Sequence, residues 1–134
     1  MSVPVAIPAL LYGLFLFDLS LAVWAFFLPD LWFAAFHGVP RVDPQAFLPR
    51  CGAAWAAFSL FQLVAALRWK RHPHWLAVVA GIRLSDALTD WTYLALCHDV
   101  TWFGRASLFA TSPLNALLGW YLLRVYASIA APRR

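Results

Sequence analysis

Long apolar stretches alternate with short polar segments along this chain. A helix that crosses a membrane needs about 20 predominantly apolar residues. Four windows have this length and character: residues 6–28, 51–69, 74–97 and a last one that ends near 130. A chain of 134 residues has the length of one domain. The pattern predicts an all-α integral membrane protein in which residues 1–134 form a single bundle of four transmembrane helices.

The start of the fourth window is ambiguous in the sequence. Ser112-Pro113 is a typical pair for a helix N-cap and first turn. The fourth span therefore begins either near residue 103, with a kink at the proline, or at Pro113, and the second start is preferred. Two aromatic-rich segments, 29–38 and 101–111, are expected to be one or two short helices at the membrane surface, or loops with aromatic anchors.

The composition agrees with a membrane environment. The chain is 63% hydrophobic and 12% charged, whereas soluble proteins are about 45–50% apolar and about 25% charged. All six acidic residues are aspartates, and Lys70 is the single lysine. The net charge of +4 is divided among the segment ends instead of forming a continuous basic stripe. A nucleic-acid partner is therefore not expected, whereas the lipid bilayer is.

The placement of Lys and Arg predicts the orientation of the bundle. Six basic residues belong to one side, namely Arg68, Lys70, Arg71, Arg124, Arg133 and Arg134. Three belong to the other side, namely Arg41, Arg50 and Arg105. Because cytoplasmic loops are enriched in Lys and Arg, both termini are predicted to be cytoplasmic. The expected location is a bacterial inner membrane.

Four ionisable residues lie within the predicted spans. Asp18 is close to the middle of the first window, and Arg83, Asp86 and Asp90 belong to the third. Since a helix turns about 100° per residue, positions 83, 86 and 90 fall within roughly 60° of one another. A charge at the bilayer centre costs about 2.5–3.5 kcal/mol on insertion scales. These side chains are therefore predicted to face the bundle interior, in a polar network that Gln62, Asn115, Tyr93, Ser85 and Thr89 complete.

Three carboxylates in this predicted network share one deep arginine. Arg83 can pair locally with Asp86 and can reach a second carboxylate through its fork of donors. At least one aspartate then needs a proton, water, a bound cation or a cationic ligand. Two interpretations stay open: the charges hold the helices in register, or they form a ligand pocket, a proton relay or an ion path.

Cysteine and histidine residues gather near the non-cytoplasmic face that the orientation predicts. Cys51 and Cys97 stand at the ends of two windows, with His37 and His98 nearby in the sequence. A disulfide is compatible with an oxidising compartment, but isolated interfacial residues are the favoured interpretation. No metal site is predicted, because the ligand spacing is not tight. The sequence has no C-x-x-C, phosphate loop, nucleophile elbow or H-E-x-x-H, and no catalytic residue or cofactor is assigned.

These patterns favour a small non-catalytic membrane protein. The layout is similar, in architecture alone, to small bacterial four-helix proteins of the DoxX-like kind and to sterol- and amine-binding four-helix bundles. The first hypothesis is an accessory or assembly subunit, or a small bundle that binds a lipophile. The alternatives are an oligomeric transporter or ion conduit that uses the aspartates, and an intramembrane lipid-modifying enzyme. Expected partners are another membrane protein, a second copy of the chain, or a small lipophilic or cationic ligand.

Overall fold

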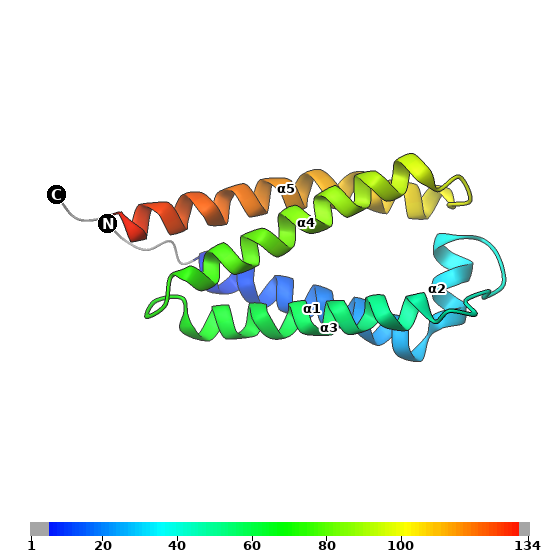
Figure 1. Cartoon of the computed structure of the whole chain (residues 1–134), viewed down its shortest axis with the longest axis horizontal. Coiled ribbons are helices and arrows are strands. Elements are labelled where there is room, and N and C mark those ends of the chain that lie inside the picture. The colour runs from blue at the N-terminus through cyan, green and yellow to red at the C-terminus, as the bar shows by residue number, and fades with distance from the viewer. Residues whose placement is uncertain (1–5, 132–134) are drawn as a thin grey trace.

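A computed structural model describes residues 6–131, which form five helices and no strand. The helices are α1 (Ala6–Phe27), α2 (Pro29–Phe36), α3 (Phe47–Arg68), α4 (His74–Leu96) and α5 (Trp102–Ala130) (Figure 1). The predicted all-α class is confirmed. Two of the helices, α1 and α3, are long and apolar enough to cross a membrane. Helices α4 and α5 are as long, but three charged residues interrupt the apolar sequence of α4.

The four long helices form two pairs. Helix α1 packs along α3, and α4 packs along α5, while the pairs meet mainly where α3 contacts α4. Figure 1 shows the pairs as two layers that are joined at one end by the turn between α3 and α4. At the other end the short helix α2 stands across the space between the layers and contacts both α1 and α5.

Local sequence signals explain where α2 and α3 begin. Pro29 occupies the first turn of α2, where its missing N–H is not needed. The loop that follows turns through the left-handed conformation at Gly38 and Ala46. The Asp43 carboxylate then accepts hydrogen bonds from the N–H groups of Phe47 (2.8 Å) and Leu48 (3.0 Å), which are free donors at the start of α3. The predicted short helix in segment 29–38 is therefore present.

Helix α5 begins at Trp102 and continues without a break through Pro113. The alternative with a start near residue 103 is therefore correct, and the preferred start at Pro113 is wrong. The physical reason is an upstream cap: the Thr101 hydroxyl accepts from the N–H of Gly104 at 3.0 Å. Segment 101–111 is accordingly the first part of α5 and not a separate short helix.

One end of the bundle is filled by an apolar core. Its buried members come from all four long helices and are Ile7, Leu11, Leu14, Ala65, Trp69, Leu76, Val79, Ala80 and Leu122. This end includes the turn between α3 and α4, because Trp69 follows the last residue of α3 directly.

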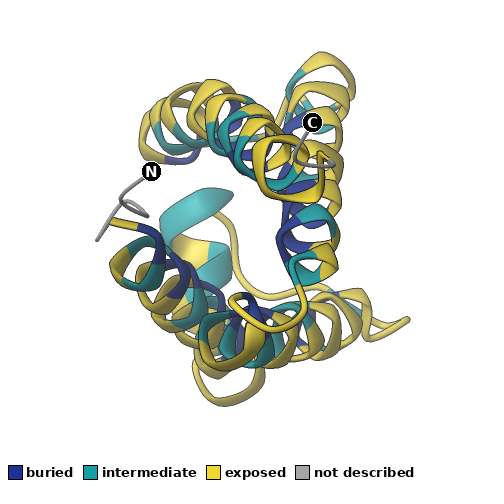
Figure 2. Cartoon of the chain, turned by 90° about the vertical axis from the view of Figure 1, so that its left-hand side faces the viewer, coloured by how far each residue is buried: buried dark blue, intermediate teal, exposed yellow. Residues whose placement is uncertain are grey.

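Farther along the bundle, the long helices bury polar side chains and expose large apolar ones. The buried polar residues are Asp18, Ser59, Gln62, Arg83, Ser112 and Asn115. Large apolar side chains are exposed on every long helix, including Leu16, Phe27, Leu60, Leu67, Leu88, Leu96, Phe109 and Leu117. Figure 2 shows the buried positions on the inner faces of the helices and the exposed positions outside. In this part of the bundle the distribution is the reverse of the one that is expected in water.

Candidate functional site

The interior carries one wholly buried arginine, Arg83 of α4, with a relative exposure of 0%. Its Nη2 lies 2.5 Å from Asp18 Oδ2 on α1 and 2.9 Å from Asp86 Oδ2 one turn along α4. Its Nη1 donates to Asn115 Oδ1 on α5, at 3.4 Å. A guanidinium suits this position because its planar fork of donors can serve several acceptors at once.

Helix α3 supplies the remaining contact of this cluster. The Gln62 side chain is fully buried, and its Nε2 donates to Asp18 Oδ2 at 2.6 Å. Each long helix therefore contributes at least one polar residue to the same network: Asp18 from α1, Gln62 from α3, Arg83 and Asp86 from α4 and Asn115 from α5. The network joins the two helix pairs through side chains.

The structure brings only some of the predicted network residues into the cluster and places the others elsewhere. Asp86 belongs to the cluster, but its side chain keeps a relative exposure of 20%. Asp90 accepts a hydrogen bond from the Thr111 hydroxyl at 3.3 Å and makes no ion pair among the described residues. Ser85 and Thr89 are exposed, and the Thr89 hydroxyl donates only to the Ser85 carbonyl of its own helix.

Tyr93 lies outside the network and contacts the region of α2. Its hydroxyl is 3.3 Å from Nδ1 of His37, which follows α2, and that nitrogen is also 3.2 Å from the Asp99 carbonyl. The sequence-based prediction grouped Tyr93 with the polar network, whereas its hydroxyl contacts His37 instead. The prediction could not place α2, because the path of the loops decides where a short helix docks.

Two hydroxyl groups on α5, one of them buried, were not predicted as site residues. Ser112 is wholly buried, and its Oγ donates to the Ala87 carbonyl of α4 at 3.0 Å. Thr111 is the partner of Asp90. The available signal for Ser112 was its spacing, since positions 112, 115 and 119 are three and four residues apart on one buried helical stripe. Pro113, which follows Ser112, instead favours the interpretation of this segment as a helix start.

The electrostatics of the cluster remain unbalanced. Asp18 and Asp86 share the one guanidinium, and Asp90 has only a hydroxyl partner. Two buried atoms, Gln62 Oε1 and Arg83 Nε, have no hydrogen-bond partner within residues 6–131. The arrangement holds four helices together and, through partly exposed Asp86, can take up a proton or a cation.

The predicted Cys/His group is not assembled as one cluster. Cys51 and Cys97 are free thiols, since they stand on different helix pairs, at the start of α3 and the end of α4. His98 is exposed, and its carbonyl accepts from Arg105 at 3.0 Å. Within residues 6–131, no three His, Cys, Asp or Glu side chains are grouped closely enough to hold a metal ion.

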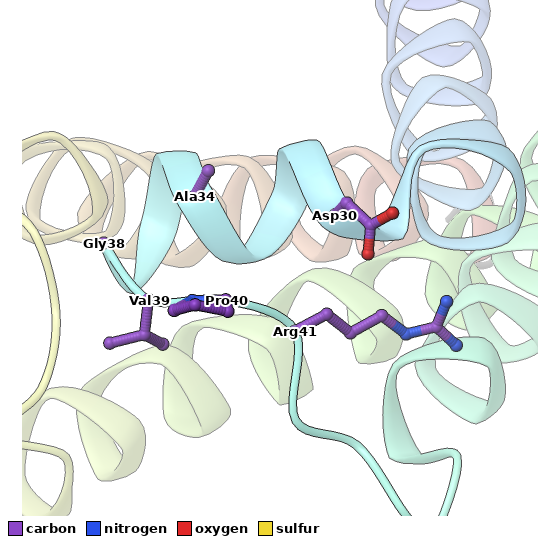
Figure 3. A pocket seen from close by; sticks show the side chains of 6 residues that line it. All are labelled: Asp30, Ala34, Gly38, Val39, Pro40 and Arg41. Carbon is purple, nitrogen blue, oxygen red and sulfur yellow. The ribbon is translucent and has the colours of Figure 1, made fainter.

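Two surface depressions lie at opposite ends of the bundle, away from the buried cluster. One is formed by α2 and the loop after it and is lined by Asp30, Ala34, Gly38, Val39, Pro40 and Arg41 (Figure 3). Asp30 and Arg41 make no ion pair with each other there. The other depression is at the turn between α3 and α4 and is lined by Leu67, Arg68, Lys70, Arg71 and His72.

No protein-family model, no curated protein and no solved structure matches this chain.

Proposed function

We propose that this chain is an integral membrane protein that spans the bilayer four times, with α1, α3, α4 and α5 as the spans. The reversed distribution of side chains supports this placement. Burying Arg83, Asp18 and Gln62 while exposing large apolar side chains on every long helix is unfavourable in water. It is favourable in lipid, where charged side chains must face the bundle interior.

In this proposal the turn between α3 and α4 and the two ends of the chain face the cytoplasm. The turn carries Arg68, Lys70 and Arg71, and Arg124 is in the last part of α5 at the same end. Arg133 and Arg134, which also entered the sequence-based orientation, lie outside the described residues. The excess of basic residues on this side follows the positive-inside tendency.

The function that we infer is that of a non-catalytic accessory or assembly subunit of a membrane complex. The observation that carries it is the occupied interior. One end of the bundle is filled by the apolar core, and its middle is closed by a network to which all four long helices contribute. A lipophile held inside the bundle would have to displace these contacts. The exposed apolar surface of the long helices is free to contact another membrane protein.

The test is to purify the full-length chain from native membranes in mild detergent and to identify what accompanies it. A second protein in fixed stoichiometry is the expected result. A chain that is recovered alone with a bound lipophile would replace the accessory role by the lipophile-binding one. Recovery in the aqueous fraction without detergent would contradict the membrane placement itself.

One observation favours a proton or cation conduit as a second candidate. Asp86 touches the buried Arg83 and is still partly exposed, and Asp90 follows it one turn later on α4. The two carboxylates thus lead from the buried cluster toward the surface. If this path conducts, reconstituted vesicles will show flux that depends on pH or potential, and both Asp86→Asn and Asp90→Asn will reduce it. Vesicles with intact protein and no flux would remove this candidate.

A further inference from the structure

The turn between α3 and α4 is the most strongly basic part of the described surface. Arg68, Lys70 and Arg71 stand within four residues, and no acidic residue occurs anywhere between positions 44 and 85. None of these three cations forms an ion pair with a described residue. Their positive charge is therefore available to an external anion.

The backbone of this turn is fixed. Trp69 is buried in the apolar core, and its N–H donates to the Ala65 carbonyl at 2.9 Å. The N–H groups of Arg71 and His72 both donate to the Arg68 carbonyl, at 3.0 and 2.9 Å. Because Trp69 anchors the turn from inside, the basic side chains on both sides of it are held at the surface.

These side chains surround an open depression. Arg68, Lys70, Arg71 and His72 are all exposed and line a volume of about 620 Å³ together with Leu67. The first residue of α4 is His74, two positions after His72. The amino end of a helix carries partial positive charge, which adds to the attraction that the basic side chains exert on an anion.

Exposed apolar side chains are also present on both helices below the depression. Leu67 is 67% exposed, and Phe61 and Val78 are also exposed, on α3 and α4 respectively. The rings of Phe61 and Trp75 lie 6.3 Å apart, so that the aromatic surface connects the two helices below the turn. A ligand that fits this surface has an anionic end and a long apolar end.

We propose that this turn binds the phosphate headgroup of an anionic phospholipid of the cytoplasmic leaflet, with the acyl chains along the exposed surface of α3 and α4. Basic groups at the ends of membrane helices attract such headgroups, and Arg and Lys bind phosphate through charge-assisted hydrogen bonds. This site rests on the proposed membrane placement. A free phosphate ion would use the charges but would gain nothing from the apolar surface.

The experiment compares lipid binding by native mass spectrometry of the full-length protein in detergent, with phosphatidylglycerol and phosphatidylcholine as probes. The test variant is Arg68→Gln/Lys70→Gln/Arg71→Gln. The matched control, Arg41→Gln/Arg50→Gln/Arg105→Gln, removes the same number of charges at the opposite end. We expect the wild type and the control to prefer phosphatidylglycerol. The test variant should lose affinity for it by about fivefold for each charge removed.

A charge-conserving variant and a competition with inorganic phosphate complete the experiment. The variant Arg68→Lys/Arg71→Lys retains the charges and is expected to retain phosphatidylglycerol, which separates loss of charge from loss of folding. Millimolar inorganic phosphate is expected to leave the bound lipid in place. Equal binding of both lipids, equal loss in the control variant, or displacement by inorganic phosphate would each overturn the lipid site.

Flotation with phosphatidylcholine vesicles distinguishes this inference from the proposed function. A protein that floats with these vesicles but shows no preference for phosphatidylglycerol is a membrane protein without this site. A protein that associates neither with phosphatidylcholine vesicles nor with phosphatidylglycerol vesicles refutes both the membrane placement and the site that depends on it.

Discussion

At the scale of single residues, Arg83 is the largest fully buried side chain in the described part of the chain. It is wholly buried and contacts carboxylates of α1 and α4 and an amide of α5. The removal of one partner of a buried ion pair is much more harmful than the replacement of both, because it leaves a charge without compensation. The stability of the bundle should therefore depend on Arg83 and Asp18 together.

We predict that Arg83→Met destabilises the folded bundle by about 3 kcal/mol or more, since it leaves Asp18 and Asp86 without a cation. Denaturant unfolding in detergent, followed by circular dichroism, measures the change. The double variant Arg83→Met/Asp18→Asn should recover part of the loss. The exposed Arg124 supplies a control, Arg124→Gln, with little expected effect. Additive losses in the double variant would show that the two side chains are not coupled.

Much of the cluster could be predicted at this scale. The helical period placed Arg83 and Asp86 on one stripe, and the cost of a charge in lipid directed Asp18 toward them. Gln62 and Asn115 were expected to complete the network, and the structure brings both to it. The sequence could not predict that Asp90 would turn to Thr111, because the choice of partner depends on how far α5 is rotated against α4.

At the scale of helices, each pair depends on a close approach of its two members. Gly119 of α5 faces α4, where an added Cβ would lie 2.8 Å from Leu84 Cγ and 3.1 Å from the Ala80 carbonyl oxygen. Gly81 of α4 points to open space, where an added Cβ would meet nothing within 4 Å. A methyl group therefore fits at Gly81 but not at Gly119, although both glycines belong to the same helix pair.

We predict that Gly119→Ala destabilises the protein by about 1–3 kcal/mol, because the methyl group forces α4 and α5 apart. Gly81→Ala is the matched control and should leave stability unchanged or slightly higher, since alanine is the better helix former. Thermal unfolding of the purified variants compares the two. An equal effect of both substitutions would argue against the close contact at Gly119.

Helix α2 is held by Thr101. The Thr101 hydroxyl donates to the Ala35 carbonyl at 2.6 Å and caps α5, and its N–H donates to the Phe36 carbonyl at 2.9 Å. Gly104 allows this approach, because an added Cβ would lie 2.8 Å from the Phe36 carbonyl oxygen. One side chain thus joins the end of α2 to the start of α5.

We predict that Thr101→Val costs about 1–2 kcal/mol through the lost cap and speeds hydrogen exchange of the α2 amides. Thr92→Val is the control, because Thr92 is exposed and its hydroxyl donates only to Leu88 of its own helix. Hydrogen exchange of the α2 amides is measured by mass spectrometry in both variants. Unchanged exchange in α2 would mean that Thr101 does not hold this helix.

At the scale of the whole molecule, the ends of the bundle differ in charge. The turn between α3 and α4 is purely basic, whereas Asp30, Asp43 and Asp99 are at the opposite end. In the proposed membrane placement, the larger number of Lys and Arg residues at the end with the turn sets the orientation. This placement predicts that the two ends are accessible from opposite sides of the membrane.

We predict that a membrane-impermeant maleimide labels Gln45→Cys from outside intact cells and labels Lys70→Cys only after the membrane is opened. Both substitutions are made in a Cys51→Ser/Cys97→Ser background, and both positions are exposed. The opposite result would invert the proposed orientation. Labelling of both positions in intact cells would contradict a membrane crossing by α3, which is the helix between them.

The sequence by itself determined the helical class, the approximate extent of the long helices and the inward direction of Asp18, Arg83 and Asp86. These features follow from local periodicity and from the cost of exposing a charge to lipid. Only the tertiary structure decided that α5 runs through Pro113, that Asp90 pairs with Thr111 and that Tyr93 contacts His37. Those outcomes depend on how helices distant in the sequence are rotated and docked against one another, which no local pattern specifies.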